Sequence, residues 1–199
     1  MSTWISKAVR RAAFTILVGA GLMGCQQGAG LPVLSLLPAN EVLSVYGGDV
    51  RVAGSRHYCP DKSSLRETEE TAIVLLGRCS ASSEAPPAVV TVSVGAKGSA
   101  GVLQSDGAAL AAFLLSDAGR ASLSRNSRAR DIEIRAARME KGVFLVLVDD
   151  RQQGRYWRGM LPVAGYLVSV TATGPSLSSD DGLELVQQTA RALQNANRP

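Results

Sequence analysis

Short apolar runs separated by turn-forming residues predict strands over much of the chain. Before residue 100 these runs occupy residues 42–46, 50–58, 71–77 and 88–94. The first two are separated by Gly47, Gly48 and Asp49, which favour a tight turn, and Pro86 and Pro87 precede the fourth. After residue 130 the pattern returns at residues 131–138, 143–149, 155–161 and 166–173, with turns at 139–142 and 162–165.

Two segments have the periodicity of helices instead. In the first, Leu110, Phe113 and Leu114 share a face. Asp106 is the expected N-cap of this helix, and Gly119 is its expected end. In a second, C-terminal helix, Asp181 is the expected cap, with Glu184 as its capping-box partner. The apolar stripe of the C-terminal helix consists of Leu183, Val186, Ala190 and Leu193.

The order strands, helix, strand hairpins, helix predicts an α+β fold. We expect a mainly antiparallel sheet of about six to eight strands with two covering helices. The strand signals begin near residue 41, and the chain length beyond that point suits one hydrophobic core. We therefore expect residues 41–199 to form a single α+β domain.

Residues 1–24 have the composition of an export signal. Lys7, Arg10 and Arg11 form a basic start, and the uncharged run 12–23 follows. A helix of that length spans only about 18 Å, which is too short for a hydrocarbon core of roughly 30 Å. We interpret the segment as a signal peptide. The alternative is an uncleaved apolar N-terminus with an accidental cysteine.

The residues Leu22, Met23, Gly24 and Cys25 end this segment and resemble the lipobox of bacterial lipoproteins, although Met23 is a less usual choice. The resemblance implies cleavage between Gly24 and Cys25 and a lipid-modified Cys25 thiol. Acyl chains on Cys25 would then hold the protein to a membrane, since two chains make a stable anchor. Gln26 occupies the position where an aspartate signals inner-membrane retention in enterobacteria. We therefore expect a lipoprotein of the cell envelope, in the outer membrane and facing the periplasm.

Removal of the leader changes the charge of the chain. Residues 1–24 carry three of the 21 basic side chains and none of the 17 acidic ones, which leaves 18 against 17. A nearly neutral chain gives no case for nucleic-acid binding. Residues 25–40, rich in Gln, Gly and Pro, are the expected lipidated tether between the membrane and the domain.

Cysteine usage agrees with export. With Cys25 lipidated, Cys59 and Cys79 remain as a pair in an oxidising compartment, and we predict a disulfide between them. Two reduced, buried cysteines are the alternative. A metal site has less support, because only His57 lies nearby and no second Cys or His completes four ligands. No cofactor motif is found in the mature sequence, so no cofactor is expected.

Arginines concentrate in residues 120–158, which hold ten basic side chains against five acidic ones. If the two hairpins are adjacent, these arginines form one basic surface for anionic lipid, lipopolysaccharide phosphates or an acidic protein. The alternative is that they are solvated strand faces paired with neighbouring carboxylates. The residues singled out for this surface are Arg135, Arg138, Arg155, Trp157 and Arg158. Trp157 is either part of the core or an exposed anchor.

The search for catalytic residues gives little. His57 is the only histidine, and it lies between Arg56 and Tyr58 beside the expected disulfide. No Gly-x-Ser-x-Gly elbow or phosphate loop occurs. We expect a structural or surface role for His57 and no catalytic residue. An enzyme would need a cleft that gathers His57 with a carboxylate and a serine.

Two segments resemble known proteins by their pattern. Residues 141–195, with two hairpins, the aromatic pair Tyr156 and Trp157 and a final helix, resemble the closing part of PsbP-like and DcrB-like domains. Residues 58–61 with 75–79 are similar to small uncharacterised envelope proteins of alphaproteobacteria. Neither resemblance implies a catalytic residue. The predicted function is a membrane-anchored binding or assembly module whose partner is an envelope protein or anionic lipid. The alternatives are a periplasmic enzyme and a carrier of a lipid or small ligand.

Overall fold

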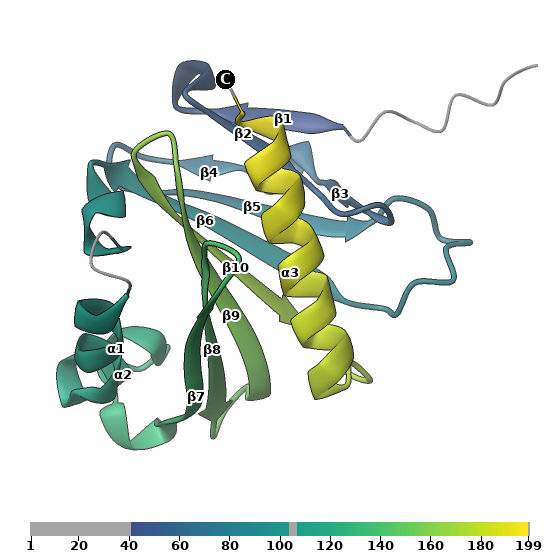
Figure 1. Cartoon of the computed structure of the whole chain (residues 1–199). Coiled ribbons are helices and arrows are strands. Elements are labelled where there is room, and N and C mark those ends of the chain that lie inside the picture. The colour runs from purple at the N-terminus through teal and green to yellow at the C-terminus, as the bar shows by residue number, and fades with distance from the viewer. Residues whose placement is uncertain (1–40, 104–106, 199) are drawn as a thin grey trace, which may run out of the picture. The chain divides into compact units, whose positions relative to one another are not determined.

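The computed structural model describes residues 41–103 and 107–198, which contain ten strands and three α-helices (Figure 1). The predicted α+β class is confirmed. The strands are β1 (Val42–Val45), β2 (Val50–Ala53), β3 (Tyr58–Pro60), β4 (Arg66–Glu67), β5 (Ala72–Arg78), β6 (Val89–Lys97), β7 (Ile132–Glu140), β8 (Val143–Asp150), β9 (Gly154–Val163) and β10 (Tyr166–Thr173). The helices are α1 (Ala108–Leu115), α2 (Asp117–Leu123) and α3 (Ser179–Ala196). Gly24, Cys25 and residues 25–40, which are predicted to form the tether, lie outside the described residues.

Eight of these strands form one antiparallel sheet. Its order is β3-β5-β6-β10-β9-β8-β7, and β4 also pairs with β5. Two of its hairpins close through tight turns at Lys141 and Gly142 and at Ala164 and Gly165, all four with positive φ. Positive φ at both central residues matches the twist of adjacent antiparallel strands, so the predicted turns at these places are confirmed. Strands β1 and β2 form a separate two-stranded hairpin.

Helix α3 and the β1–β2 hairpin pack on one face of the sheet, which we call the α3 face (Figure 1). Alternate residues of the sheet strands, such as Val74, Val92 and Val170, are fully buried there against Val186 and Leu193 of α3. This alternation is the two-residue period of a strand that is buried on one side. Of the described helices, none has the length and apolar character needed to cross a bilayer.

Helices α1 and α2 pack on the opposite face of the sheet, which we call the α1 face. They cover the end of the sheet made by β7, β8 and β9, where Leu110 and Leu123 contact a cluster that includes Phe144, Val148 and Met160. Strand β8 is therefore buried on both sides. Burial on both sides explains why its sequence is a continuous apolar run rather than an alternating one.

The single helix predicted to begin at Asp106 is two helices, so this prediction was wrong. Ser116 adopts an extended conformation between α1 and α2, and its hydroxyl caps α2 by accepting a hydrogen bond from the Gly119 amide at 3.1 Å. Gly119 does not end a helix. A Cβ atom there would lie 1.9 Å from the Phe113 carbonyl oxygen, so glycine permits the close approach of the two helices. Asp106 lies outside the described residues.

The C-terminal helix begins earlier than predicted. Its cap is Ser178, which accepts a hydrogen bond from the Asp181 amide at 3.1 Å and donates one to the Asp181 carboxylate at 2.6 Å. Asp181 is thus the hydrogen-bond partner of the cap rather than the cap itself. In the predicted apolar stripe, Leu183 is only half-buried, and Leu185 is the buried leucine of that turn.

The second predicted strand is also divided. Strand β2 ends at Ala53, and Tyr58 begins β3 in the large sheet. The chain bends sharply between them, and only glycine fits at position 54 of this bend. A Cβ atom on Gly54 would lie 1.8 Å from the Tyr58 carbonyl oxygen. The bend places His57 in a loop between the two sheets.

Candidate functional site

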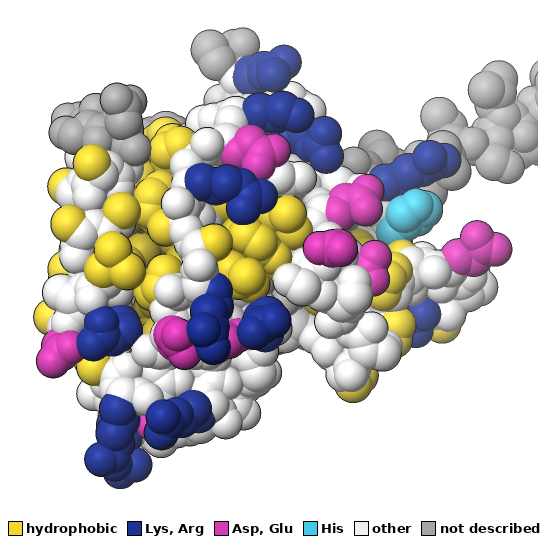
Figure 2. Space-filling view, turned by 60° about the horizontal axis from the view of Figure 1, so that its bottom comes forward, with side chains coloured by type: hydrophobic (Ala, Val, Ile, Leu, Met, Phe, Trp, Pro, Cys, Tyr) yellow, Lys and Arg dark blue, Asp and Glu magenta, His cyan; other side chains and the backbone are white. Residues whose placement is uncertain are grey.

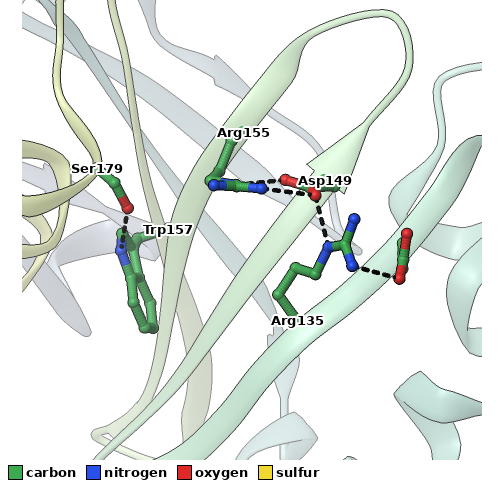
Figure 3. Close-up of polar contacts among 6 residues, drawn as sticks. Arg135, Asp149, Arg155, Trp157 and Ser179 are labelled. Carbon is green, nitrogen blue, oxygen red and sulfur yellow. Dashed lines mark hydrogen bonds and ion pairs between the residues drawn. The ribbon is translucent and has the colours of Figure 1, made fainter.

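The two arginine-rich hairpins are adjacent, and a charged network crosses them on the α3 face (Figure 3). The Asp149 carboxylate accepts hydrogen bonds from Arg135 Nε at 2.6 Å and from Arg155 Nε and Nη2 at 2.6 and 3.0 Å. Arg135 also pairs with Glu133 at 2.7 Å. The hydrogen bonds from Arg155 and Arg135 hold the pKa of Asp149 far below its usual value. Two of the predicted basic residues are therefore neutralised by carboxylates.

Trp157 belongs to the core. Its side chain is 6% exposed, and its indole Nε1 donates a hydrogen bond to Ser179 Oγ at 3.2 Å, which ties β9 to the first residue of α3 (Figure 3). The Arg138 guanidinium lies 4.8 Å from the centre of the Trp157 ring, and its Nε contacts Glu140 at 3.3 Å. Of the two roles left open for Trp157, the structure assigns the structural one.

Arg158 lies on the α1 face, away from the other predicted residues. Its Nε donates to Thr171 Oγ1 at 3.1 Å, and its guanidinium lies 5.9 Å from the Tyr156 ring. Along β9, Arg155 and Trp157 point one way and Arg158 the other, because side chains alternate along a strand. Of the two interpretations left open, a single basic surface that includes Arg158 is therefore wrong, because Arg158 lies on the other face of the sheet.

A β-bulge accounts for the placement of the two arginines of β7. Strict alternation would put Arg135 and Arg138 on opposite faces, since three positions separate them. The pairing of β7 with β8 shifts between Ile134 and Ala136, and this bulge brings both arginines to the α3 face. No signal in the sequence marks the bulge.

The predicted disulfide is present. Cys59 of β3 is bonded to Cys79, which follows β5, and their Cα atoms are 4.9 Å apart. Beside it, the Cys79 amide donates a hydrogen bond to the His57 carbonyl at 2.9 Å. The Tyr58 hydroxyl donates to the Pro86 carbonyl. These bonds fix the loop that carries His57 against the loop before β6.

A cleft that the sequence did not reveal lies next to this disulfide. A cavity of about 300 Å³ is lined by His57, Glu84, Asp181, Glu184 and Gln188, with apolar side chains between them. We call it the His57 cleft. Figure 2 shows the histidine (cyan) beside acidic side chains (magenta). Its walls come from the β2–β3 loop, the segment before β6 and the first half of α3, which are distant in sequence.

A second, more open cavity of about 700 Å³ adjoins the His57 cleft and shares His57 and Gln188 with it. Its lining includes Arg56 and Arg191, neither of which forms an ion pair with a described residue. Ser55 also lines it, 5% exposed, with a hydroxyl that has no hydrogen-bond partner among the described residues. The two cavities together place negative charge at one end and positive charge at the other.

The larger cavity contains a serine and a histidine, the residue types of a nucleophile and its base. Ser55 and His57 line the same cavity, but no hydrogen bond joins them within the described residues. Among all the residues that the structure describes, no group of three or more His, Cys, Asp or Glu side chains is arranged to hold a metal ion.

Comparison of the chain with protein-family models, with curated proteins and with solved structures gave no significant match. The resemblances of residues 22–25 to a lipobox and of residues 141–195 to PsbP-like and DcrB-like domains therefore stay predictions.

Proposed function

We propose that this protein is a lipid-anchored binding module of the bacterial cell envelope. The observation that carries the proposal is the disulfide between Cys59 and Cys79. Such bonds persist in oxidising compartments, which favours an exported protein. It also accounts for two of the three cysteines of the chain, and the third, Cys25, is the residue that the lipobox pattern assigns to acyl chains.

The anchor is tested by the mass of the intact protein extracted from membranes. A chain that begins at Cys25, is heavier by acyl groups and gains two hydrogens on reduction is the expected result. The control is Cys25→Ser, which should keep the leader and carry no lipid. A wild-type chain that retains residues 1–24 with an unmodified Cys25 would contradict the proposal.

The His57 cleft and its neighbouring cavity support a binding role because their charged side chains are open to a ligand. The acidic end, at Glu84 and Glu184, suits a cationic group, and the end at Arg56 and Arg191 suits an anionic one. An extended polar segment of an envelope protein presents both kinds of group. The network at Asp149, in contrast, is already satisfied within the protein.

Photo-crosslinking in the producing bacterium tests this surface. A crosslinking side chain at Gln188, shared by both cavities, should capture a defined partner protein. The same side chain at Glu69, an exposed position away from the cleft, is the matched control. Capture of the same proteins from both positions, or from neither, would contradict a protein partner at the cleft.

A hydrolase is a second candidate, because His57 and carboxylates share a cleft that adjoins Ser55. For this function the Ser55 hydroxyl has to become exposed and reach the imidazole. Labelling of the protein by a fluorophosphonate that His57→Ala abolishes would support it. Absence of labelling at Ser55 would leave the binding module as the proposed function.

A further inference from the structure

Helix α1 is apolar around its whole circumference, since none of its eight residues has a polar side chain. Leu110 and Leu114 enter the core, but Phe113 and Leu115 are 47% and 56% exposed. Two more exposed apolar side chains lie beside it. Val102 of the preceding turn (Ser99–Leu103) is 47% exposed and Met139 of β7 is 40% exposed. Met139 lies beside the start of the helix, since a Cβ atom on Gly107, the residue before α1, would lie 3.3 Å from Met139 Sδ.

We call Val102, Phe113, Leu115 and Met139 the α1 patch. Figure 2 shows hydrophobic side chains gathered along this side of the molecule, with basic side chains and fewer acidic ones along their lower border. Helices α1 and α2 lie on the side of the sheet away from α3 (Figure 1), so the patch and α3 are on opposite sides of the sheet. Exposed apolar patches of this kind mark surfaces that contact a partner or a membrane.

Arginines border the α1 patch. Arg120 donates to the Leu115 carbonyl at the end of α1 and pairs with Asp117. The exposed segment after α2 carries Arg125, Arg128 and Arg130, none of which forms an ion pair with a described residue. From residue 107 to residue 130 these four arginines stand against one acid, Asp117. The border of the patch is therefore positively charged.

We propose that the α1 patch docks the domain on an anionic bilayer surface, with Phe113 and Leu115 at the level of the acyl chains and the arginines at the phosphates. An apolar helix bordered by basic residues has the chemistry of an interfacial membrane helix. The proposal rests on the proposed lipid anchor, which keeps the bilayer within reach. Only the 15 residues 26–40 separate Cys25 from the first described residue.

Quenching of tryptophan fluorescence by brominated lipid tests the docking. The full chain carrying Phe113→Trp is titrated with vesicles of phosphatidylethanolamine and phosphatidylglycerol that have brominated or ordinary acyl chains. The matched control is Val89→Trp, at a residue of β6 that is 44% exposed and outside the patch. After subtraction of the unsubstituted protein, the indole at position 113 should lose about half of its emission to bromine. The indole at position 89 should lose little.

The arginines are tested by charge reversal. Arg125→Glu combined with Arg128→Glu should weaken the quenching at position 113, as should vesicles of phosphatidylcholine alone. Equal quenching at both positions, or none at the highest lipid concentration, would overturn the docking. A concentration-dependent dimer in lipid-free solution that Phe113→Ser abolishes would assign the patch to a second copy of the chain and would also overturn it.

The mass of the intact protein in the same sample shows whether Cys25 is acylated. It therefore distinguishes a failure of the docking from a failure of the lipid anchor. An acylated protein without quenching at position 113 overturns the docking and leaves the anchor intact. If the protein is not acylated but brominated vesicles still quench the indole at position 113, the docking is supported and the lipid anchor is contradicted.

Discussion

Asp149 and Thr189 show how single side chains determine the energetics of this protein. Asp149 receives three hydrogen bonds from two arginines, so its charge is fully compensated on the surface of the sheet. Thr189 is the opposite case. It is completely buried on α3, and its hydroxyl has no partner among the described residues. A polar group placed in the core without a hydrogen bond lowers stability, whereas a compensated charge adds to it.

Asp149→Asn should lower the free energy of unfolding near neutral pH by about 1 kcal/mol, because it removes the charge that holds two arginines. The pKa of Asp149 is lowered by the hydrogen bonds from Arg155 and Arg135. Its contribution is therefore complete above about pH 4, the ordinary carboxyl value, and is lost as the pH falls further. Urea titrations near neutral pH and near pH 3 measure the difference. Asp117→Asn, at an exposed ion pair, is the control and should change stability less.

Thr189→Val should raise the free energy of unfolding by about 1 kcal/mol, since it replaces an unpartnered buried hydroxyl by a methyl group of similar size. Thr189→Ser keeps the hydroxyl and loses the methyl group, so it should lower stability. Urea unfolding of both variants checks the prediction. A Val variant less stable than the wild type would indicate a hydrogen bond to bound water.

At the scale of elements, the boundaries depend on close contacts between segments. Gly54 and Gly119 each lie against a backbone carbonyl of another residue, and these contacts set the bend after β2 and the corner between α1 and α2. The same reasoning applies to the edge of the sheet. Strand β3 is only three residues long, and the bond between Cys59 and Cys79 adds a covalent link to its pairing with β5.

Cys59→Ser with Cys79→Ser should lower the free energy of unfolding by about 3 kcal/mol, because the unfolded chain regains the conformational entropy that the disulfide-closed loop had lost. In a domain of this size, that loss lowers the melting temperature by roughly 6–12 °C. Calorimetry of the variant beside the reduced and the oxidised wild type checks it. The reduced wild type is the matched control and should melt with the double variant. A reduced protein as stable as the oxidised one would show that the edge strand holds without the bond.

At the scale of the molecule, the two apolar clusters lie on opposite faces of the same strands. Leu145 faces α3, and its neighbours Phe144 and Val146 face α1 and α2. Strand β9 is shared in the same way, with Leu161 on the α3 face and Met160 on the other. Neither layer of helices can leave the sheet without exposing one side of these central strands.

We therefore expect the domain to unfold in one cooperative transition. Trp157 reports on the α3 face, and it is the only tryptophan left when residues 1–24 are removed. Its fluorescence and the far-ultraviolet circular dichroism of the whole domain should give coincident unfolding curves in urea. A fluorescence transition separate from the dichroism transition would mean that the layers unfold independently.

The sequence by itself determined the α+β class, most of the strands, the hairpin turns and the disulfide pair. These follow from simple rules: the two-residue period of half-buried strands, the preference of glycine for positive φ and the pairing of the two cysteines that remain when Cys25 is assigned to lipid. It also indicated that the arginines could be solvated and paired with neighbouring carboxylates, and Arg135 and Arg155 are paired with Asp149 in this way. The position of Arg158 on the opposite face could have been predicted from the same two-residue period.

Only the tertiary structure decided which residues meet across long sequence separations. The His57 cleft combines a loop near residue 57, the segment before β6 and α3, and no local pattern reports that these segments converge. No sequence pattern marks the bulge in β7, yet the bulge determines that Arg135 and Arg138 lie on the same face of the sheet. The exposure of Phe113, which the helical period placed with core residues, depends on where α2 turns away at Ser116. Such features arise from packing between segments that are distant in sequence. The free energy of this packing is distributed over many contacts, so no single motif reports it.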